Sequence, residues 1–205
     1  RKVDKLPKAL FHLARAAHYD GPGALTPEGR KQILPYFDKQ YANYHGDKEG
    51  VEKVIELAKA SALPKPDFDI ESKVKRYERD LAAQAEQDKK FPEKALWRTI
   101  KDTLNSVDGQ KYFDESMLNA AMPGGVEVAG SRVIKFKGIV VGSEPEVNPK
   151  ELRISITDGT TPEVTLKLDG ALKGKLENGT EIGFEGVPEG YVKDPFNVVF
   201  LTERS

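Results

Sequence analysis

Four basic side chains alternate with apolar residues along the strands expected in the C-terminal third of the sequence. They are Lys135, Lys137, Arg153 and Lys167. Alternation directs them away from the apolar side chains, so we expect all four on one outer surface. Cations spread over neighbouring strands could follow a phosphate backbone or bind an acidic protein. The same pattern is also typical of solvent-facing lysines on a sheet.

The surroundings of these four cations favour a protein partner over a nucleic acid. No aromatic residue shares their face to stack on a base, and Glu151 and Glu163 occupy the same alternate positions. Residues 131–205 contain 10 Lys and Arg against 12 Asp and Glu. Because a nucleic-acid module usually carries a basic excess, we expect a protein partner. A module for single-stranded nucleic acid or another anionic polymer is the alternative.

Few groups in the sequence are suited to catalysis or metal binding. There is no cysteine, and 32 Lys and Arg against 33 Asp and Glu give a net charge of -1. His12, His18 and His45 have neither a His-x3-His spacing nor a flanking carboxylate motif, so the sequence predicts no metal site. No nucleophile elbow, phosphate loop or zinc-protease helix occurs. We expect a non-enzymatic binding protein with no catalytic residue and no cofactor. An activity that depends on two carboxylates brought together only by folding remains an open alternative.

The elements that carry these residues change type near residue 123. Apolar residues recur every three or four positions before it, which predicts helices over 6–19, 27–46, 47–62, 70–90, 92–104 and 109–118. Alternation after it predicts strands over 132–141, 151–157, 163–168, 180–187 and 196–203. The fold class is therefore α+β in two domains. We expect a helical domain at 1–122, a linker at 123–130 and a five-stranded closed barrel at 131–205.

Aromatic residues recur with helical spacing in the second predicted helix. They are Tyr36, Phe37, Tyr41 and Tyr44. Such a series could line a peptide groove, as helical repeats do on their concave face, but its spacing favours packing between helices.

Both halves carry a family resemblance. The sequence ALFHLARAA at 9–17, followed by a second amphipathic helix, resembles the helix pair of a divergent tetratricopeptide repeat, over 1–62, with further helices over 63–122. The segments VIKFKGIVV, VTLKL and LENGTEIGFEGV resemble an OB-fold barrel of the bacterial tRNA-anticodon-binding type. Gly138 fits the glycine that lets the first strand of such barrels coil, and Asn178-Gly179-Thr180 fits the turn before the fourth strand.

The combination of the two halves is similar to uncharacterised bacterial proteins with tetratricopeptide repeats and a C-terminal OB-like domain. That resemblance implies protein binding by the repeats beside a barrel of unassigned ligand. The sequence begins at Arg1, so we expect a signal peptide and further repeats upstream. The signal peptide would place the protein in the periplasm or outside the cell. No apolar run approaches the roughly 18 residues of a membrane span. The sequence does not indicate an oligomeric state.

Overall fold

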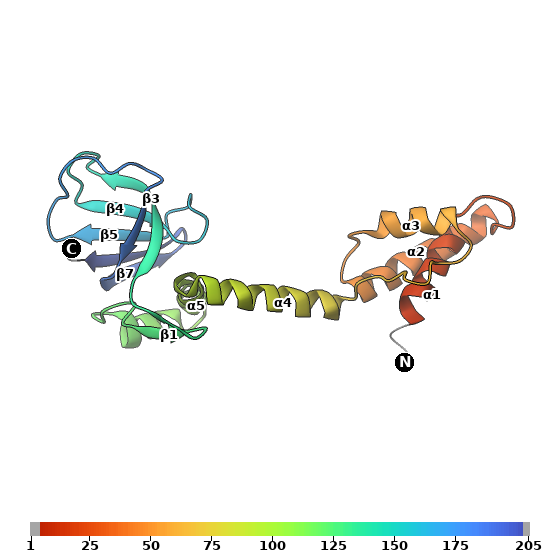
Figure 1. Ribbon diagram of the computed structural model, residues 1–205, viewed down its shortest axis with the longest axis horizontal. Helices are drawn as coiled ribbons and strands as arrows, with labels where there is room; N and C mark the ends of the chain where they lie inside the picture. The colour runs from red at the N-terminus through yellow and green to blue at the C-terminus, as the bar shows by residue number, and fades with distance from the viewer. Residues whose placement is uncertain (1–4, 203–205) are drawn as a thin grey trace. The chain divides into compact units, whose positions relative to one another are not determined.

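The computed structural model describes residues 5–202 and divides the chain into two compact units, one ending at Ala82 and one beginning at Ala83 (Figure 1). The helices are α1 (Leu6–His18), α2 (Pro27–His45), α3 (Val51–Ala60), α4 (Lys73–Lys90), α5 (Pro92–Asn105), α6 (Gly109–Tyr112) and the π-helix η2 (Phe113–Met117). The strands are β1 (Val126–Val128), β2 (Ser131–Val133), β3 (Phe136–Glu144), β4 (Glu151–Ser155), β5 (Val164–Leu168), β6 (Glu181–Phe184), β7 (Val187–Lys193) and β8 (Phe196–Thr202). Helices precede strands, so the predicted α+β organisation is confirmed at this level. Glu203, where the last predicted strand ends, lies outside the described residues. Within 5–202, no helix has both the length and the apolar character to cross a bilayer.

Local capping sets the ends of the helices in the first unit. The Thr26 hydroxyl accepts the Gly29 N–H at 3.1 Å, and Pro27 occupies the first turn of α2. Gly46, with φ of 108°, ends α2 in the left-handed region that suits glycine. The third predicted helix starts at Val51 rather than Asp47, because Gly50 at φ 72° holds the preceding residues in a loop.

The core of the first unit is made by α1, α2 and α3 together with Ile70. Its buried residues are Leu10, Phe11, Ala14, Ala17, Phe37, Tyr41, Val54, Ala58 and Ile70. Ala14 and Ala58 are fully buried, and their small side chains let α1 and α3 approach closely. Phe37 and Tyr41 lie in this core, so the packing role predicted for them is confirmed, whereas Tyr36 is exposed.

The apolar residues of α4 recur with a helical period but remain exposed. No residue of α4 is buried, and Val74, Tyr77 and Leu81 are 57%, 68% and 56% exposed. The helical spacing predicted α4 correctly as a helix, but it did not predict the exposure of these three apolar side chains.

The second unit contains one six-stranded sheet and a separate β1–β2 hairpin. The sheet order is β6-β3-β4-β5-β8-β7, with β5 and β8 parallel and the other neighbours antiparallel. The predicted closed barrel of five strands is therefore wrong in that form. The predicted strand over 180–187 is interrupted at Gly186, whose backbone N–H and carbonyl pair with Met122 instead of the sheet. The predicted strand over 132–141 is also divided, into β2 and β3, with Ile134 exposed between them.

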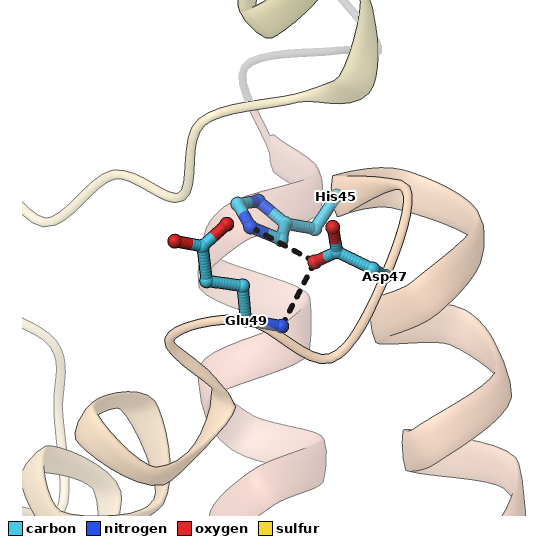
Figure 2. A group of neighbouring side chains, drawn as sticks. All are labelled: His45, Asp47 and Glu49. Carbon is cyan, nitrogen blue, oxygen red and sulfur yellow. Dashed lines mark hydrogen bonds and ion pairs between the residues drawn. The ribbon is translucent and has the colours of Figure 1, made fainter. Parts of the chain in front are cut away.

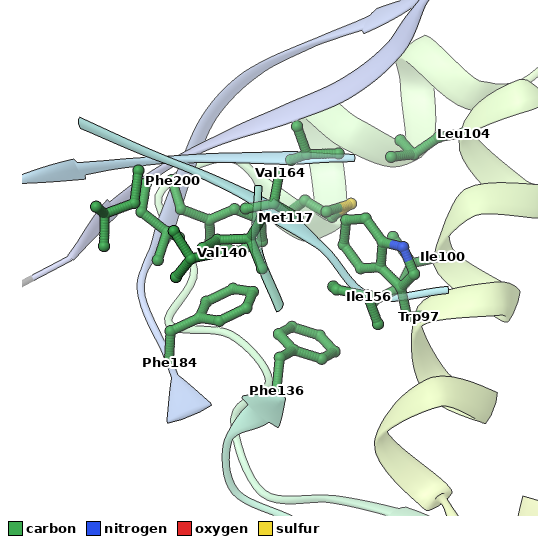
Figure 3. Packing of buried hydrophobic residues seen from close by; sticks show 14 of the residues in the cluster. Trp97, Ile100, Leu104, Met117, Phe136, Val140, Ile156, Val164, Phe184 and Phe200 are labelled. Carbon is green, nitrogen blue, oxygen red and sulfur yellow. The ribbon is translucent and has the colours of Figure 1, made fainter. Parts of the chain in front are cut away.

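Helix α5 shares its core with the sheet of the second unit. Figure 3 shows Trp97, Ile100 and Leu104 of α5 facing the buried side chains of the strands. The ring centroids of Trp97 and Phe136 lie 5.6 Å apart in an edge-to-face arrangement. The compact units thus differ from the predicted 1–122 and 131–205 domains, since the apolar faces of α5 and η2 pack on strands rather than on the earlier helices.

Close packing between β3 and β4 leaves no room for a side chain at Gly138. A Cβ atom there would overlap the Ile154 side chain and the Ser155 carbonyl oxygen. The glycine noticed in the sequence therefore permits a close approach of two strands.

Glu163 is buried rather than on the outer surface where alternation placed it. It lies just before β5, and its side chain is 3% exposed. Its carboxylate accepts hydrogen bonds from Lys101 Nζ at 2.6 Å and from the Thr157 N–H at 2.7 Å. These contacts join α5 to the connection between β4 and β5.

Candidate functional site

The four predicted basic residues lie on or beside β3, β4 and β5, and all four are exposed. Arg153 pairs with Thr165, and Lys167 pairs with Glu151. Arg153 and Lys167 are therefore diagonal neighbours on one face of the sheet. The other two lie toward β6, with Lys137 opposite Gly183 and Lys135 just before β3. The set consequently divides into two pairs rather than forming one continuous patch.

Glutamates accompany three of these cations. The shortest separations between charged atoms are 3.9 Å for Lys135 and Glu185, 3.2 Å for Arg153 and Glu144, and 3.1 Å for Lys167 and Glu189. Among residues 5–202, no ion pair joins Lys137 to a carboxylate. Exposed pairs add little stability, but each carboxylate reduces the positive potential around its cation.

A cavity of about 860 Å³ opens in the second unit beside Lys135. Leucine side chains of β4, β5 and the loop before β6 form much of its lining, namely Leu152, Leu166, Leu168, Leu172 and Leu176. Lys137, Arg153 and Lys167 do not border it. Lys135 is therefore the one member of the four predicted basic residues that borders this cavity.

A groove of about 730 Å³ lies in the first unit, between α3 and the segment 61–71 that follows it. Its apolar lining includes Phe11 of α1, Val54 and Leu57 of α3, and Phe68 and Ile70 of the segment. Phe11 and Phe68 meet edge to face with ring centroids 5.1 Å apart. The groove thus has an aromatic and aliphatic floor built from three parts of the chain.

Charged residues surround this groove, and some already have partners. The Arg79 Nη1 atom lies 2.6 Å from Glu71 Oε2. Lys53 and Lys65, by contrast, form no ion pair with any carboxylate in the described part of the chain. These two lysines add positive charge to the groove, whose lining also includes Asp67, a carboxylate with no ion pair in the described part of the chain.

A histidine and two carboxylates within five residues of sequence lie beside the groove, and His45 and Glu49 line it. His45 is the last residue of α2, and Asp47 and Glu49 lie in the loop before α3. One ligand atom from each residue lies within 4.8 Å of those from the other two. Figure 2 shows the imidazole between the two carboxylates.

Hydrogen bonds fix this loop and the histidine ring. The Asp47 carboxylate accepts the Glu49 N–H at 2.8 Å, and the Tyr41 hydroxyl donates to the Glu49 carbonyl at 2.7 Å. His45 Nδ1 lies 2.7 Å from the Glu71 carbonyl oxygen. His45 Nε2 is buried without a hydrogen-bond partner and lies 3.6 Å from Asp47 Oδ1.

Arg76 offsets one of the two negative charges of the carboxylates. Its guanidinium donates to Asp47 Oδ2 at 2.9 Å and to Glu49 Oε2 at 2.8 Å. The Glu49 N–H and then Arg76 hold the pKa of Asp47 below its usual value, because both stabilise the charged form. Asp47 is therefore ionised at neutral pH, and its Oδ1 atom faces the histidine.

Sequence reasoning missed this cluster. Carboxylates do flank His45, but at alternate positions on one side, in the order His45-x-Asp47-x-Glu49. The signal that could have found it is the combination of that spacing with a helix end at Gly46, since the turn folds both carboxylates back toward the ring. His12 and His18 are not part of the cluster.

No protein-family model, curated protein or solved structure matches this chain.

Proposed function

We propose that this chain is a non-enzymatic binding protein that holds an acidic peptide segment of a partner protein in the groove of the first unit. The observation that carries the proposal is a 730 Å³ groove with an apolar floor and two lysines in its lining. Apolar side chains of a peptide would bury the floor, while its carboxylates would pair with Lys53 and Lys65.

The finer fold assignments belong to the same proposal. Buried Ala14 and Ala17 on α1 support a divergent tetratricopeptide-like packing of α1 and α2, in which small residues allow helices to approach. In the second unit, only Glu185 and Gly186 separate β6 from β7, the two end strands of the sheet order. Counted as one bent strand, they would give five strands and an OB-like, partly open barrel. This second unit would offer its exposed sheet face as a further protein contact.

Peptide selection tests the proposal without a known partner. We expect a random peptide library displayed on phage to yield, on the full chain, peptides that combine Asp or Glu with apolar residues. Leu57→Glu in the groove should weaken the selected peptides at least about tenfold, which is about 1.4 kcal/mol. Leu34→Glu is the matched control, because Leu34 and Leu57 are both 37% exposed and only Leu57 lines the groove.

Two results would contradict groove binding. One is the absence of any enriched peptide, and the other is equal binding by wild type and Leu57→Glu. The alternative nucleic-acid function predicts that a fluorescent single-stranded oligonucleotide binds at low salt and dissociates as salt rises. It also predicts loss of that binding when Lys135, Lys137, Arg153 and Lys167 are replaced by Glu. We expect no such binding, because three of these cations already lie beside glutamates.

A further inference from the structure

We infer that His45, Asp47 and Glu49 form a binding site for one divalent transition-metal ion, for which Zn²⁺ is the best-matched cation. The three side chains offer an imidazole nitrogen and two carboxylate oxygens within 4.8 Å of one another. The inference concerns these side chains alone and does not depend on what occupies the groove.

The protonation of the imidazole is set by its contact with Glu71. The Glu71 carbonyl can only accept a hydrogen bond, so the proton of a neutral His45 ring lies on Nδ1. Nε2 then presents a lone pair toward the carboxylates. Metal-binding histidines commonly have this arrangement, in which a backbone carbonyl fixes the tautomer and the other nitrogen binds the ion.

The unpartnered lone pair is the observation that points to a cation. His45 Nε2 is buried, the His45 side chain is 11% exposed, and Asp47 Oδ1 lies 3.6 Å from Nε2. Two lone-pair atoms facing each other repel unless a positive charge lies between them. That charge is either a proton on Nε2 or a metal ion, and the experiment below separates the two.

Arg76 leaves a coordinating oxygen on each carboxylate. It binds Asp47 Oδ2 and Glu49 Oε2, so Asp47 Oδ1 and Glu49 Oε1 are not held by the guanidinium. The two carboxylates and Arg76 together carry a net charge of about -1. A dication is therefore still attracted, and Arg76 acts as a positioning residue that holds both carboxylates in place.

The ligand types favour zinc over magnesium or calcium. Imidazole nitrogen is a good ligand for Zn²⁺, whereas Mg²⁺ and Ca²⁺ prefer oxygen ligands alone. Three protein ligands also leave a coordination position for water or another group. His45 and Glu49 line the groove, so this position would lie beside it.

Calorimetric titration of the untagged full chain with ZnCl₂ alone tests the site. We expect one ion per chain, and we expect Mg²⁺ to bind much more weakly. His45→Gln and Glu49→Gln should each weaken Zn²⁺ binding at least about tenfold. His12→Gln is the matched control, because His12 is an exposed histidine outside the cluster and its replacement should leave the affinity unchanged.

Misfolding cannot explain a loss of binding in Glu49→Gln, since the Glu49 side chain is 74% exposed, and circular dichroism checks each variant. Absence of zinc binding by the wild type at millimolar metal would overturn the inference in favour of a proton on Nε2. Equal zinc affinity in wild type and His45→Gln would also overturn it. Because the titration contains no peptide, its failure is distinguishable from failure of the groove proposal.

Discussion

At the scale of single residues, the buried carboxylate of Glu163 shows how polar contacts hold the second unit together. One carboxylate oxygen accepts from Lys101 and the Thr157 hydroxyl, and the other accepts from the N–H groups of Ile156 and Thr157. Burial would raise the pKa of Glu163, but the hydrogen bonds from Lys101 and Thr157 outweigh it and lower the pKa from its ordinary 4.5. Glu163 therefore stays charged in the folded protein.

Glu163→Gln should lower the free energy of unfolding of the second unit by about 2 kcal/mol at neutral pH, because Lys101 loses its charged acceptor. Urea unfolding followed by the fluorescence of Trp97 measures this change. Glu189→Gln is the matched control, since it removes a carboxylate from the surface pair with Lys167 and should cost less than about 1 kcal/mol. Equal effects of the two substitutions would contradict the role given to Glu163.

The same carboxylate predicts a pH dependence. Its pKa is lower in the folded than in the unfolded chain, so the unfolded chain takes up its proton first as the pH falls. The stabilisation is fully present above about pH 4.5 and is lost as the pH falls through the folded pKa. Unfolding midpoints measured between neutral pH and the acid range should therefore fall less steeply for Glu163→Gln than for wild type. Parallel pH profiles would show that other carboxylates dominate.

The alternation of residue types predicted that the four basic residues of the sheet are exposed, but not which glutamates lie beside them. Alternation along β4 and β5 is local, so it correctly gave Arg153 and Lys167 as exposed and Leu152, Ile154 and Leu166 as buried. The glutamates beside the cations come from other strands and loops, which a single sequence does not bring together. The His45 cluster was missed for a different reason, since its ligands are close in sequence but meet only through the turn at Gly46.

At the scale of elements, Arg15 links two helices of the first unit. Its Nη1 atom donates to the Ala58 and Ser61 carbonyls at 2.6 and 2.9 Å, at the C-terminal end of α3. Its guanidinium also lies 3.8 Å from the centre of the Tyr19 ring. A cation at this end satisfies free carbonyls and opposes the negative end of the helix dipole.

Arg15→Met should therefore lower the free energy of unfolding of the first unit by about 1 to 2 kcal/mol. The loss is measured by urea unfolding with far-ultraviolet circular dichroism. Lys39→Met on α2, which removes an exposed cation, should change the stability by less than about 0.5 kcal/mol. A loss of the same size in both variants would indicate that removing any positive charge lowers the stability. The contact of Arg15 with the end of α3 would then not be responsible.

Elements with local start and stop signals were predictable, and those defined by distant pairing were not. Thr26-Pro27 and Gly46 gave both ends of α2. The break between β6 and β7 depends on the pairing of Gly186 with Met122, a residue distant in sequence, which alternation along the strand does not reveal. Helix α4 was predicted as a helix from its period, but its period did not reveal that its apolar side chains remain exposed.

At the scale of the whole molecule, the buried apolar residues of the described chain form two separate clusters. One contains Phe37, and the other contains Trp97, the single tryptophan of the sequence. Trp97 fluorescence should thus report on the second core alone, while circular dichroism reports on both.

Phe37→Ala should destabilise the first unit by about 3 to 5 kcal/mol, because it removes a fully buried ring. Circular dichroism should then show an early transition, with the midpoint of Trp97 fluorescence unchanged. Phe200→Ala, an equally buried ring in the second cluster, should move the fluorescence midpoint instead. A common shift of both signals in both variants would mean that the two units unfold as one.

The tight contact at Gly138 limits how this sequence can diverge. Any side chain there would collide with Ile154 and the Ser155 carbonyl, and one at Gly186 would collide with the Leu201 carbonyl. Surface residues of the sheet can be replaced over many generations without moving a strand, whereas these two positions cannot. A distant homologue should therefore keep glycine at the positions of Gly138 and Gly186, even where its surface charges differ.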